Sequence, residues 1–245
     1  MIDLFADKEE LAQAAAALFA DQARQKVVKN GRFSVLLAGG ETPRHTYQIL
    51  SREPYRSSIP WEKIHFFWGD ERCVPRHDTH SNAERVQRDL LKPLEIKEEQ
   101  IHRIDGSLAP QDAADAYQLA LINFFAGAPP AFDLILLGLG EDGHTASLLP
   151  GSSALEETMR WTAVTHLPYE SFSRVTLTVP ILNQGQLVLF LVSGNSKAQV
   201  LAEILGTSER SSLYPAAAIH PLANDLRWYI DRQAAQFLLK DHIQP

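Results

Sequence analysis

Short, almost uninterrupted apolar runs alternate along this chain with longer segments in which apolar residues recur at helical spacing. The four clearest runs, each bounded by Gly, Pro, Asp or Asn, are residues 33–38 (FSVLLA), 64–69 (IHFFWG), 132–138 (FDLILLG) and 186–193 (QLVLFLVS). Runs of this length without polar alternation are typical of strands that are buried on both faces, as in a parallel sheet. The pattern therefore predicts four parallel, buried strands.

The segments between these runs carry helix-start signals. Asp7 is placed to cap a first helix that we expect to end near Gly31. Two further helices are predicted after Ser81 and after Thr42, the second with Pro43 at the favoured first helical position. Strands that alternate with helices are typical of an α/β fold, so we expect a three-layer, doubly wound, mostly parallel sheet.

Three shorter runs alternate between apolar and polar residues, and they cover positions 161–167, 174–179 and 226–231. Alternation is typical of strands with one buried face. These strands either extend the parallel sheet or form a small subsidiary one, and the pattern leaves both arrangements open. A chain of 245 residues accommodates one large α/β domain, which we expect to span residues 1–245.

Composition narrows the class of protein. The 23 Lys and Arg residues are scattered and are outnumbered by 30 Asp and Glu, for a formal charge of −7, so nucleic acid is not an expected partner. The single cysteine, Cys73, excludes an internal disulfide and fits a reducing cytoplasm. No export signal and no apolar stretch of about 18 residues is present, so we expect a cytoplasmic protein without membrane contact.

The candidate chemistry lies directly after the strands, because ligands of open α/β sheets bind at the carboxyl ends of strands. After the first strand, Gly39, Gly40 and Thr42 lead into a helix within the sequence GGETP. Backbone amides in such a segment are able to bind a phosphate. A tight turn with a helix cap at Thr42 explains the same residues, and both interpretations remain open.

The sequence GDER at 69–72 follows the second strand. Arg72 is a candidate ligand for a phosphate or carboxylate, held in place by Asp70 or Glu71. A solvated cluster of self-paired charges is the alternative interpretation.

The glycine-rich sequence at 138–151, GLGEDGHTASLLPG, is the densest signal in the chain, and it places Asp142 one glycine away from His144. A histidine beside a carboxylate is the usual arrangement of a general base that works near neutral pH. The alternative is a structural histidine that caps a loop carbonyl.

Two further cations follow later strands. Lys197 lies in SGNSK near the start of a helix, where a positive charge is unfavourable unless an anion binds there. Arg174 opens the run 174–179. An exposed lysine and a surface ion pair on a strand edge explain these two residues equally well.

Other chemistries lack their residues. His77, Asp78 and His80 suggest a metal site, but an irregular polar loop explains them and no further ligand follows at metal-site spacing, so we assign no metal. No G-x-S-x-G sequence supplies a serine nucleophile, and GLGEDG lacks the acidic partner of a dinucleotide fingerprint. Cys73 lacks a basic partner, so we interpret it as a buried spectator. No cofactor is expected.

At these same motifs the sequence resembles the 6-phosphogluconolactonases, the lactone hydrolases of the oxidative pentose phosphate pathway. The motifs that carry the resemblance are GGETP, FFWGDERCVP, SNAERVQRDLL, DLILLGLGEDGHTASLLPG, RVTLTVP, SGNSK and the late dipeptide at Pro215 and Ala216. They extend over nearly the whole chain. The resemblance implies the fold of glucosamine-6-phosphate deaminase, ribose-5-phosphate isomerase and the CoA transferases. It also implies hydrolysis of 6-phospho-D-glucono-1,5-lactone without a metal.

The resemblance further implies that His144 activates water as a base, with Asp142 beside it. The phosphate contacts that it implies are Gly40, Thr42, Arg72 and Lys197. Glu41 departs from the family pattern, because many members have Ser there. A carboxylate would repel a phosphate, so we expect Glu41 to point away from it.

Two alternative functions remain. The amino-sugar-phosphate deaminases and isomerases share the LGxGxDGH loop, but the continuation TASLLPG after His144 matches the lactonases. A sugar-phosphate sensor that has lost catalysis is the second alternative, and the presence of both Asp142 and His144 argues against it. In each case the expected partner is a small sugar phosphate, and protein partners are unknown.

Overall fold

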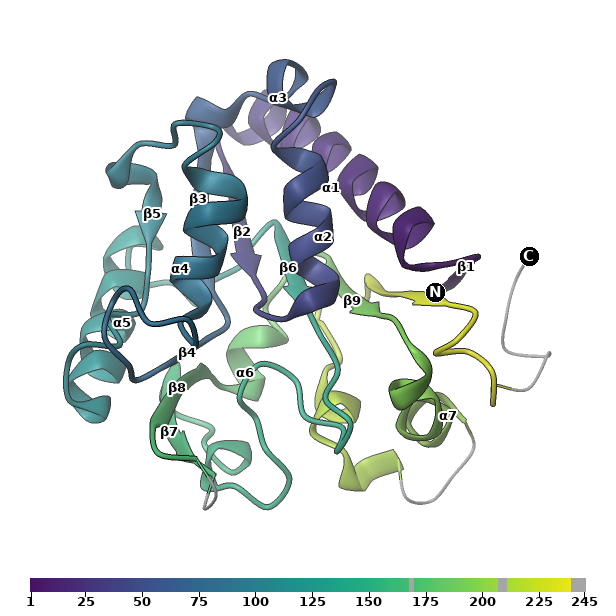
Figure 1. Ribbon diagram of the computed structural model, residues 1–245. Helices are drawn as coiled ribbons and strands as arrows, with labels where there is room; N and C mark the ends of the chain where they lie inside the picture. Colours follow the sequence, from purple (N-terminus) through teal and green to yellow (C-terminus); the bar gives the residue numbers. More distant parts are fainter. Residues whose placement is uncertain (168–169, 207–210, 239–245) are drawn as a thin grey trace.

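The computed structural model describes residues 1–167, 170–206 and 211–238, and within these ranges the strands form two sheets (Figure 1). The larger sheet has seven parallel strands, in the spatial order β1 (Ile2–Phe5), β10 (Leu226–Asp231), β9 (Val188–Val192), β6 (Leu134–Leu137), β2 (Phe33–Leu37), β3 (Ile64–Trp68) and β5 (Ile101–His102). The smaller sheet is antiparallel, in the order β4 (Asp70–Arg72), β8 (Ser173–Leu177) and β7 (Thr162–His166). The predicted α/β fold with a parallel sheet is confirmed.

Helices connect the parallel strands and cover the sheet, with α2 and α4 in front of its central strands in Figure 1. The α-helices are α1 (Lys8–Asn30), α2 (Glu41–Leu50), α3 (Tyr55–Ser58), α4 (Asn82–Val86), α5 (Pro110–Phe124), α6 (Val179–Leu182) and α7 (Ala198–Leu205). A π-helical turn, Gln87–Leu91, continues α4, and a 3₁₀ turn, Asn195–Lys197, leads into α7. The small sheet lies below the carboxyl ends of the central strands in Figure 1. After β6, the chain reaches it through residues 138–161.

The four apolar runs all form strands of the large sheet. Every residue of β2, β6 and β9 is buried, as expected for strands that are covered on both faces. The ends differ by a residue or two, because β6 begins at Leu134 and β9 at Val188, each two residues later than predicted.

The alternating runs take both of the arrangements left open. Residues 226–231 form β10 inside the large sheet, whereas β7 and β8 form the subsidiary sheet. The third strand of that sheet is β4, so Asp70–Arg72 is a strand and not the loop that we expected. Its antiparallel register places Arg72 opposite Arg174. Sequence pattern missed β4 because three polar residues carry no strand signal.

Helix starts are partly as predicted. Asp7 caps α1 by accepting the N–H of Glu10 at 2.9 Å, and Ser81 caps α4 by accepting that of Glu84 at 3.1 Å. The predicted cap at Thr42 is wrong, because α2 begins one residue earlier and Gly40 is its N-cap.

The described residues contain no helix that has both the length and the apolar character needed to cross a lipid bilayer.

Candidate active site

The loops at the carboxyl ends of β2, β6 and β9, together with the small sheet, enclose a cavity of about 780 Å³. All nine predicted site residues line it: Gly39, Gly40, Thr42, Asp70, Arg72, Asp142, His144, Arg174 and Lys197. Six of them follow the parallel strands β2, β6 and β9, and Asp70, Arg72 and Arg174 lie in the small antiparallel sheet, so their meeting follows from the two sheets and not from closeness in sequence.

The imidazole of His144 is held by Asp142. Its Nδ1 lies 2.6 Å from Asp142 Oδ1, and the backbone N–H of His144 donates to the same oxygen at 3.2 Å. The hydrogen bond from His144 lowers the pKa of Asp142 to about 2, so the carboxylate is ionised and only accepts. Nδ1 therefore carries the proton, and Nε2 of the neutral ring keeps its lone pair. Within the described part of the chain, Nε2 makes no hydrogen bond.

A glycine allows the imidazole to lie against the loop backbone. A Cβ atom on Gly140 would lie 2.2 Å from His144 Nδ1 and 2.6 Å from Asp142 Oδ1. Any side chain at position 140 would therefore displace both members of the pair. The glycine at position 140 is thus required by its close packing against His144 and Asp142.

Arg72 and Arg174 face the cavity from neighbouring strands of the small sheet. Nη1 of Arg72 donates to the carbonyl oxygen of His80 at 2.7 Å, and its buried Nε has no partner among the described residues. Arg174 is almost fully buried and donates through two nitrogens to the carboxylate of Glu170, one of them at 2.8 Å. Desolvation lowers the pKa of Arg72, and the bonds from Arg174 lower that of Glu170.

The expected support of Arg72 by Asp70 or Glu71 is not found among the described contacts of its guanidinium. Glu71 instead accepts backbone N–H groups of Arg72, Asn82 and Ala83, each at 2.7 Å, and so fixes the start of α4 to β4. Burial raises the pKa of Glu71, although these hydrogen bonds act in the opposite direction. Glu71 is thus a structural residue, and it does not line the cavity.

Asp70 is part of a buried network that the sequence did not reveal. Its carboxylate accepts from Ser147 Oγ at 2.5 Å and from Asn82 Nδ2 at 3.2 Å. Arg174 Nη1 lies 3.4 Å from the same Ser147 hydroxyl. Asp70 therefore supports the floor of the cavity, joining the small sheet to α4 and to the loop that carries His144.

The N-terminus of α2 and the turn before α7 form another part of the cavity wall. Thr42 Oγ1 lies 2.9 Å from Ser193 Oγ and links these two segments. Lys197 Nζ lies 3.7 Å from Glu141, whose pKa is lowered by a hydrogen bond from Ser196 and by the lysine charge. Glu41 also lines the cavity, but its Oε2 lies 3.2 Å from Arg44 and its side chain is mostly exposed.

Sequence reasoning missed four polar residues that line the cavity: Lys8, Asn82, Glu141 and Ser193. Lys8 follows the short strand β1, so recognition of that strand would have identified it by the rule that found the other loops. Asn82 carries no such signal, because its role depends on contacts with residues far away in the sequence.

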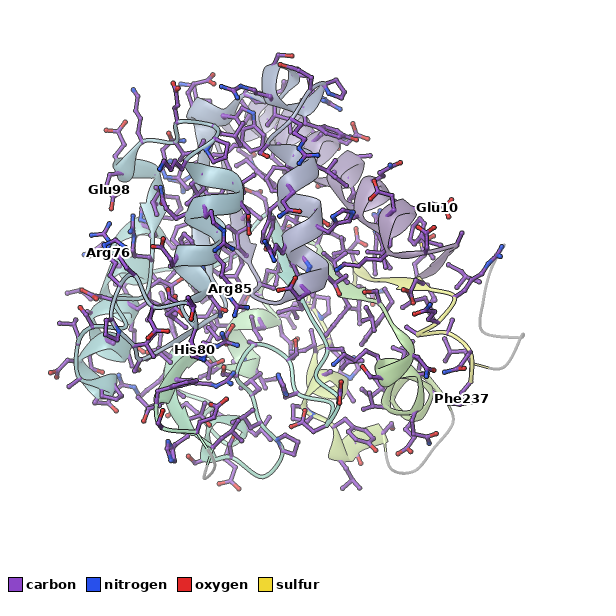
Figure 2. The ribbon with its side chains drawn as sticks, in the orientation of Figure 1. Glu10, Arg76, His80, Arg85, Glu98 and Phe237 are labelled. Atoms are coloured by element: carbon purple, nitrogen blue, oxygen red, sulfur yellow. The ribbon has the colours of Figure 1, made fainter. Side chains whose placement is uncertain are left out.

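The histidines considered for a metal site lie outside the cavity. His80, which Figure 2 labels, lies just before α4. Its Nδ1 is 2.8 Å from Asp78 Oδ1, and His77 Nδ1 is 3.3 Å from Glu84 Oε2. Across the residues described, no three His, Cys, Asp or Glu side chains gather in a way that would hold a metal ion. Cys73 is half-buried and not fully buried as expected, and burial raises its pKa to about 11. Its thiol is therefore protonated near neutral pH.

Comparison with known families gives this geometry a context. The family described as glucosamine-6-phosphate isomerases/6-phosphogluconolactonase matches residues 6–228. The chain belongs to this family. Membership confirms the resemblance drawn from the motifs.

Several relatives that match most of the chain are named 6-phosphogluconolactonase. A 6-phosphogluconolactonase of Synechocystis sp. is 38% identical over 241 residues, which cover 97% of this chain and 98% of the relative. The 6-phosphogluconolactonase of Rattus norvegicus is 36% identical, with 97% of this chain and 93% of the relative covered. A solved 6-phosphogluconolactonase from Trypanosoma brucei has a TM-score of 0.86 at 29% identity, with 98% of each chain covered.

The fold also extends to the second branch of the family. A solved monomeric glucosamine-6-phosphate deaminase has a TM-score of 0.81 at 24% identity, and the match covers 96% of this chain and 98% of that one. At this identity the likeness concerns the fold alone. It confirms the fold that the motifs implied.

Proposed function

We propose that this protein hydrolyses 6-phospho-D-glucono-1,5-lactone to 6-phosphogluconate, with His144 as the general base. The observation that carries the proposal is the His144–Asp142 pair, whose Nε2 lone pair is available in a cavity that also holds Arg72 and Lys197. The family relatives named 6-phosphogluconolactonase support the same activity.

The chemistry required is modest, because a δ-lactone is an activated cyclic ester. Nε2 of His144 takes a proton from water as its oxygen attacks the carbonyl carbon of the lactone. The tetrahedral intermediate then collapses, the bond from the carbonyl carbon to the ring oxygen breaks, and the imidazolium returns its proton to that oxygen. The products are a carboxyl group and a hydroxyl group. Asp142 stabilises the imidazolium while it carries the extra proton.

The phosphate supplies binding energy at a distance from the reacting carbonyl. Arg72, Lys197 and the first amides of α2 are the groups that we assign to it. A phosphate held at this side of the cavity orients the lactone ring over His144, and orientation lowers the barrier of the chemical step. Arg174 is balanced by Glu170 and is assigned to the same cavity with a supporting role.

The proposed setting follows from the same residues. A small-molecule substrate suits an open cavity of this size, and the formal charge of −7 disfavours nucleic acid as a partner. The single, protonated thiol is compatible with a reducing compartment, so we propose that the protein acts in the cytoplasm.

The test uses purified protein and fresh phosphorylated lactone, with acid release measured above the spontaneous rate. We expect hydrolysis by the wild type and a decrease in kcat on the order of 10²–10⁴ in His144→Ala, because the base is lost. His77→Ala is the matched control, since that exposed histidine lies outside the cavity. An unchanged kcat in His144→Ala would remove the residue from the mechanism. Release of ammonia from glucosamine 6-phosphate would instead indicate the deaminase activity of the family.

A further inference from the structure

Lys8 lies on the same rim as the proposed site. Strand β1 runs parallel to β10, so its carboxyl end points in the same direction as those of β2, β6 and β9. Strand β1 ends at Phe5, and Lys8 is the first residue of α1. Lys8 lines the cavity together with Thr42 and Lys197. Lys8 thus follows β1 in the same way that the loops described above follow β2, β6 and β9.

The first turn of α1 is held firmly in this position. Glu9 contacts His45 of α2 through its carboxylate, and Glu10 accepts the backbone N–H of Ala6 at 2.6 Å. Asp7 caps the helix. The acidic residues around Lys8 are therefore engaged with other partners, and the backbone that carries Lys8 is tied to α2.

No described residue balances the charge of Lys8. Of the four cations that line the cavity, Arg174 is paired with Glu170 and Lys197 with Glu141. Arg72 donates to a carbonyl oxygen. For Lys8, the described residues provide neither an ion pair nor a hydrogen bond to Nζ, although its side chain is half-buried.

The position is also electrostatically unfavourable without a ligand. The N-terminus of a helix carries a partial positive charge of about half a unit, and this disfavours a lysine in the first turn. Lys197 stands in the same relation to α7, at its N-cap. Two ammonium groups at two helix N-termini thus border one cavity, and a dianion between them would relieve both.

We propose that Lys8 is a phosphate contact of the substrate and a determinant of selectivity for phosphorylated over unphosphorylated lactones. This inference rests on the proposed function. When Lys8 is lost, Arg72, Lys197 and the first amides of α2 still orient the phosphorylated lactone, so Lys8 contributes to binding equally before and during the chemical step. The loss of this contact therefore raises KM and leaves kcat unchanged.

The experiment compares wild type, Lys8→Met and Lys8→Arg in two measurements. The first is the affinity for inorganic phosphate by titration calorimetry, and the second is steady-state kinetics with the phosphorylated lactone and with D-glucono-1,5-lactone. We expect Lys8→Met to weaken phosphate affinity and to raise KM for the phosphorylated lactone, each roughly 5- to 30-fold, as for a partly exposed charge-assisted hydrogen bond. Lys8→Arg should recover most of the loss.

Lys29→Met is the matched control, because Lys29 lies in the last turn of the same helix and the substitution changes the net charge equally. It should match the wild type in both measurements. Unchanged phosphate affinity and KM in Lys8→Met would overturn the inference, as would an equal loss with both lactones. Phosphate binding that depends on Lys8 in a protein without lactonase activity would overturn the proposed function and the selectivity between lactones, and would leave only the phosphate contact at Lys8.

Discussion

At the scale of single residues, the ionisation of Asp142 determines the state of His144. The carboxyl has a pKa of about 2, chiefly because His144 donates a hydrogen bond to it. Asp142 therefore stays ionised wherever the enzyme is expected to work and fixes the proton of the neutral ring on Nδ1. A carboxyl group that was protonated near neutral pH would allow the other tautomer, in which Nε2 carries the proton and has no lone pair to accept another.

The pH dependence follows from this assignment. The proposed base needs the Nε2 lone pair, so kcat/KM should fall on the acid side while Asp142, with its pKa of about 2, is still ionised. Asp142→Asn should lower kcat on the order of 10²–10³, because the amide permits the wrong tautomer. A pH–rate profile of both proteins is the measurement. An acid limb that begins only near pH 2 would assign the titration to Asp142 instead.

The same carboxyl affects folding in a defined direction. Its pKa is lower in the folded state than the ordinary value of 3.8, so its stabilising contribution is present above about pH 4 and is lost as the pH falls through about 2. Because the side chain is nearly half exposed, solvent screens this contribution.

Side-chain contacts between residues that are close in sequence could be predicted, whereas contacts between distant residues could not. His144 and Asp142 are two positions apart, so their pairing is visible in the chain itself. The contact between Ser147 and Asp70 spans 77 residues, and that between Asn82 and Asp70 depends on where α4 packs. Such contacts result from tertiary structure, and no local pattern contains them.

At the scale of elements, α4 and the loop after β2 fit together through a glycine. A Cβ atom on Gly39 would lie 2.2 Å from Asn82 Oδ1, and the amide of Asn82 is tied to Asp70. The predicted phosphate loop thus needs Gly39 for packing as much as for backbone contact with a ligand.

We expect Gly39→Ala to reduce the free energy of unfolding by about 1–3 kcal/mol, because the new methyl group displaces Asn82 from its hydrogen bonds. Denaturant unfolding measures this change. Gly138→Ala is the control, since a Cβ atom there would meet nothing within 4 Å. The double variant Gly39→Ala/Asn82→Ala should cost less than the sum of its single changes. Additive losses would contradict the clash as the cause.

Two of the proposed phosphate ligands, Arg72 and Lys197, come from different elements, β4 and the turn before α7. Arg72→Ala and Lys197→Ala should each lower kcat/KM for the phosphorylated lactone roughly 10- to 150-fold, as for a lost charge-assisted hydrogen bond. Both variants should have little effect on D-glucono-1,5-lactone, which is a poor substrate because it lacks the anchor. Steady-state kinetics with both lactones is the measurement, and Arg76→Ala, an exposed arginine outside this cavity, is the control. Equal losses on both lactones would assign the cations to the reacting carboxyl group or to the fold.

Strands with a long apolar run were predicted, and short or polar strands were not. The buried runs of β2, β3, β6 and β9 are continuous because both faces are covered. β5 has two residues and β4 has three polar ones, so neither has enough apolar positions to form a pattern. Their pairing with neighbouring strands, rather than their own composition, makes them strands.

At the scale of the whole molecule, the proposed reaction uses only protein groups. Exhaustive chelation should therefore leave the rate of lactone hydrolysis unchanged, and the described side chains include no three-residue cluster suited to a metal. The measurement compares chelated protein with protein to which single divalent ions are restored. Loss of activity on chelation, with recovery by one ion, would direct attention back to His77, Asp78 and His80.

The place of β10 in the large sheet has a consequence for how the protein is made. β10 lies between β1 and β9, so the first strand has no neighbour in the sheet until the last one is present. During synthesis, residues 2–5 must therefore wait until about 230 residues have left the ribosome. Lys8 follows that strand but is also tied to α2 through Glu9 and His45, so the pairing of β1, and not the contact between α1 and α2, depends on this final step. A nascent chain that stops short of β10 thus holds Asp142 and His144 in a sheet whose first strand is still unpaired.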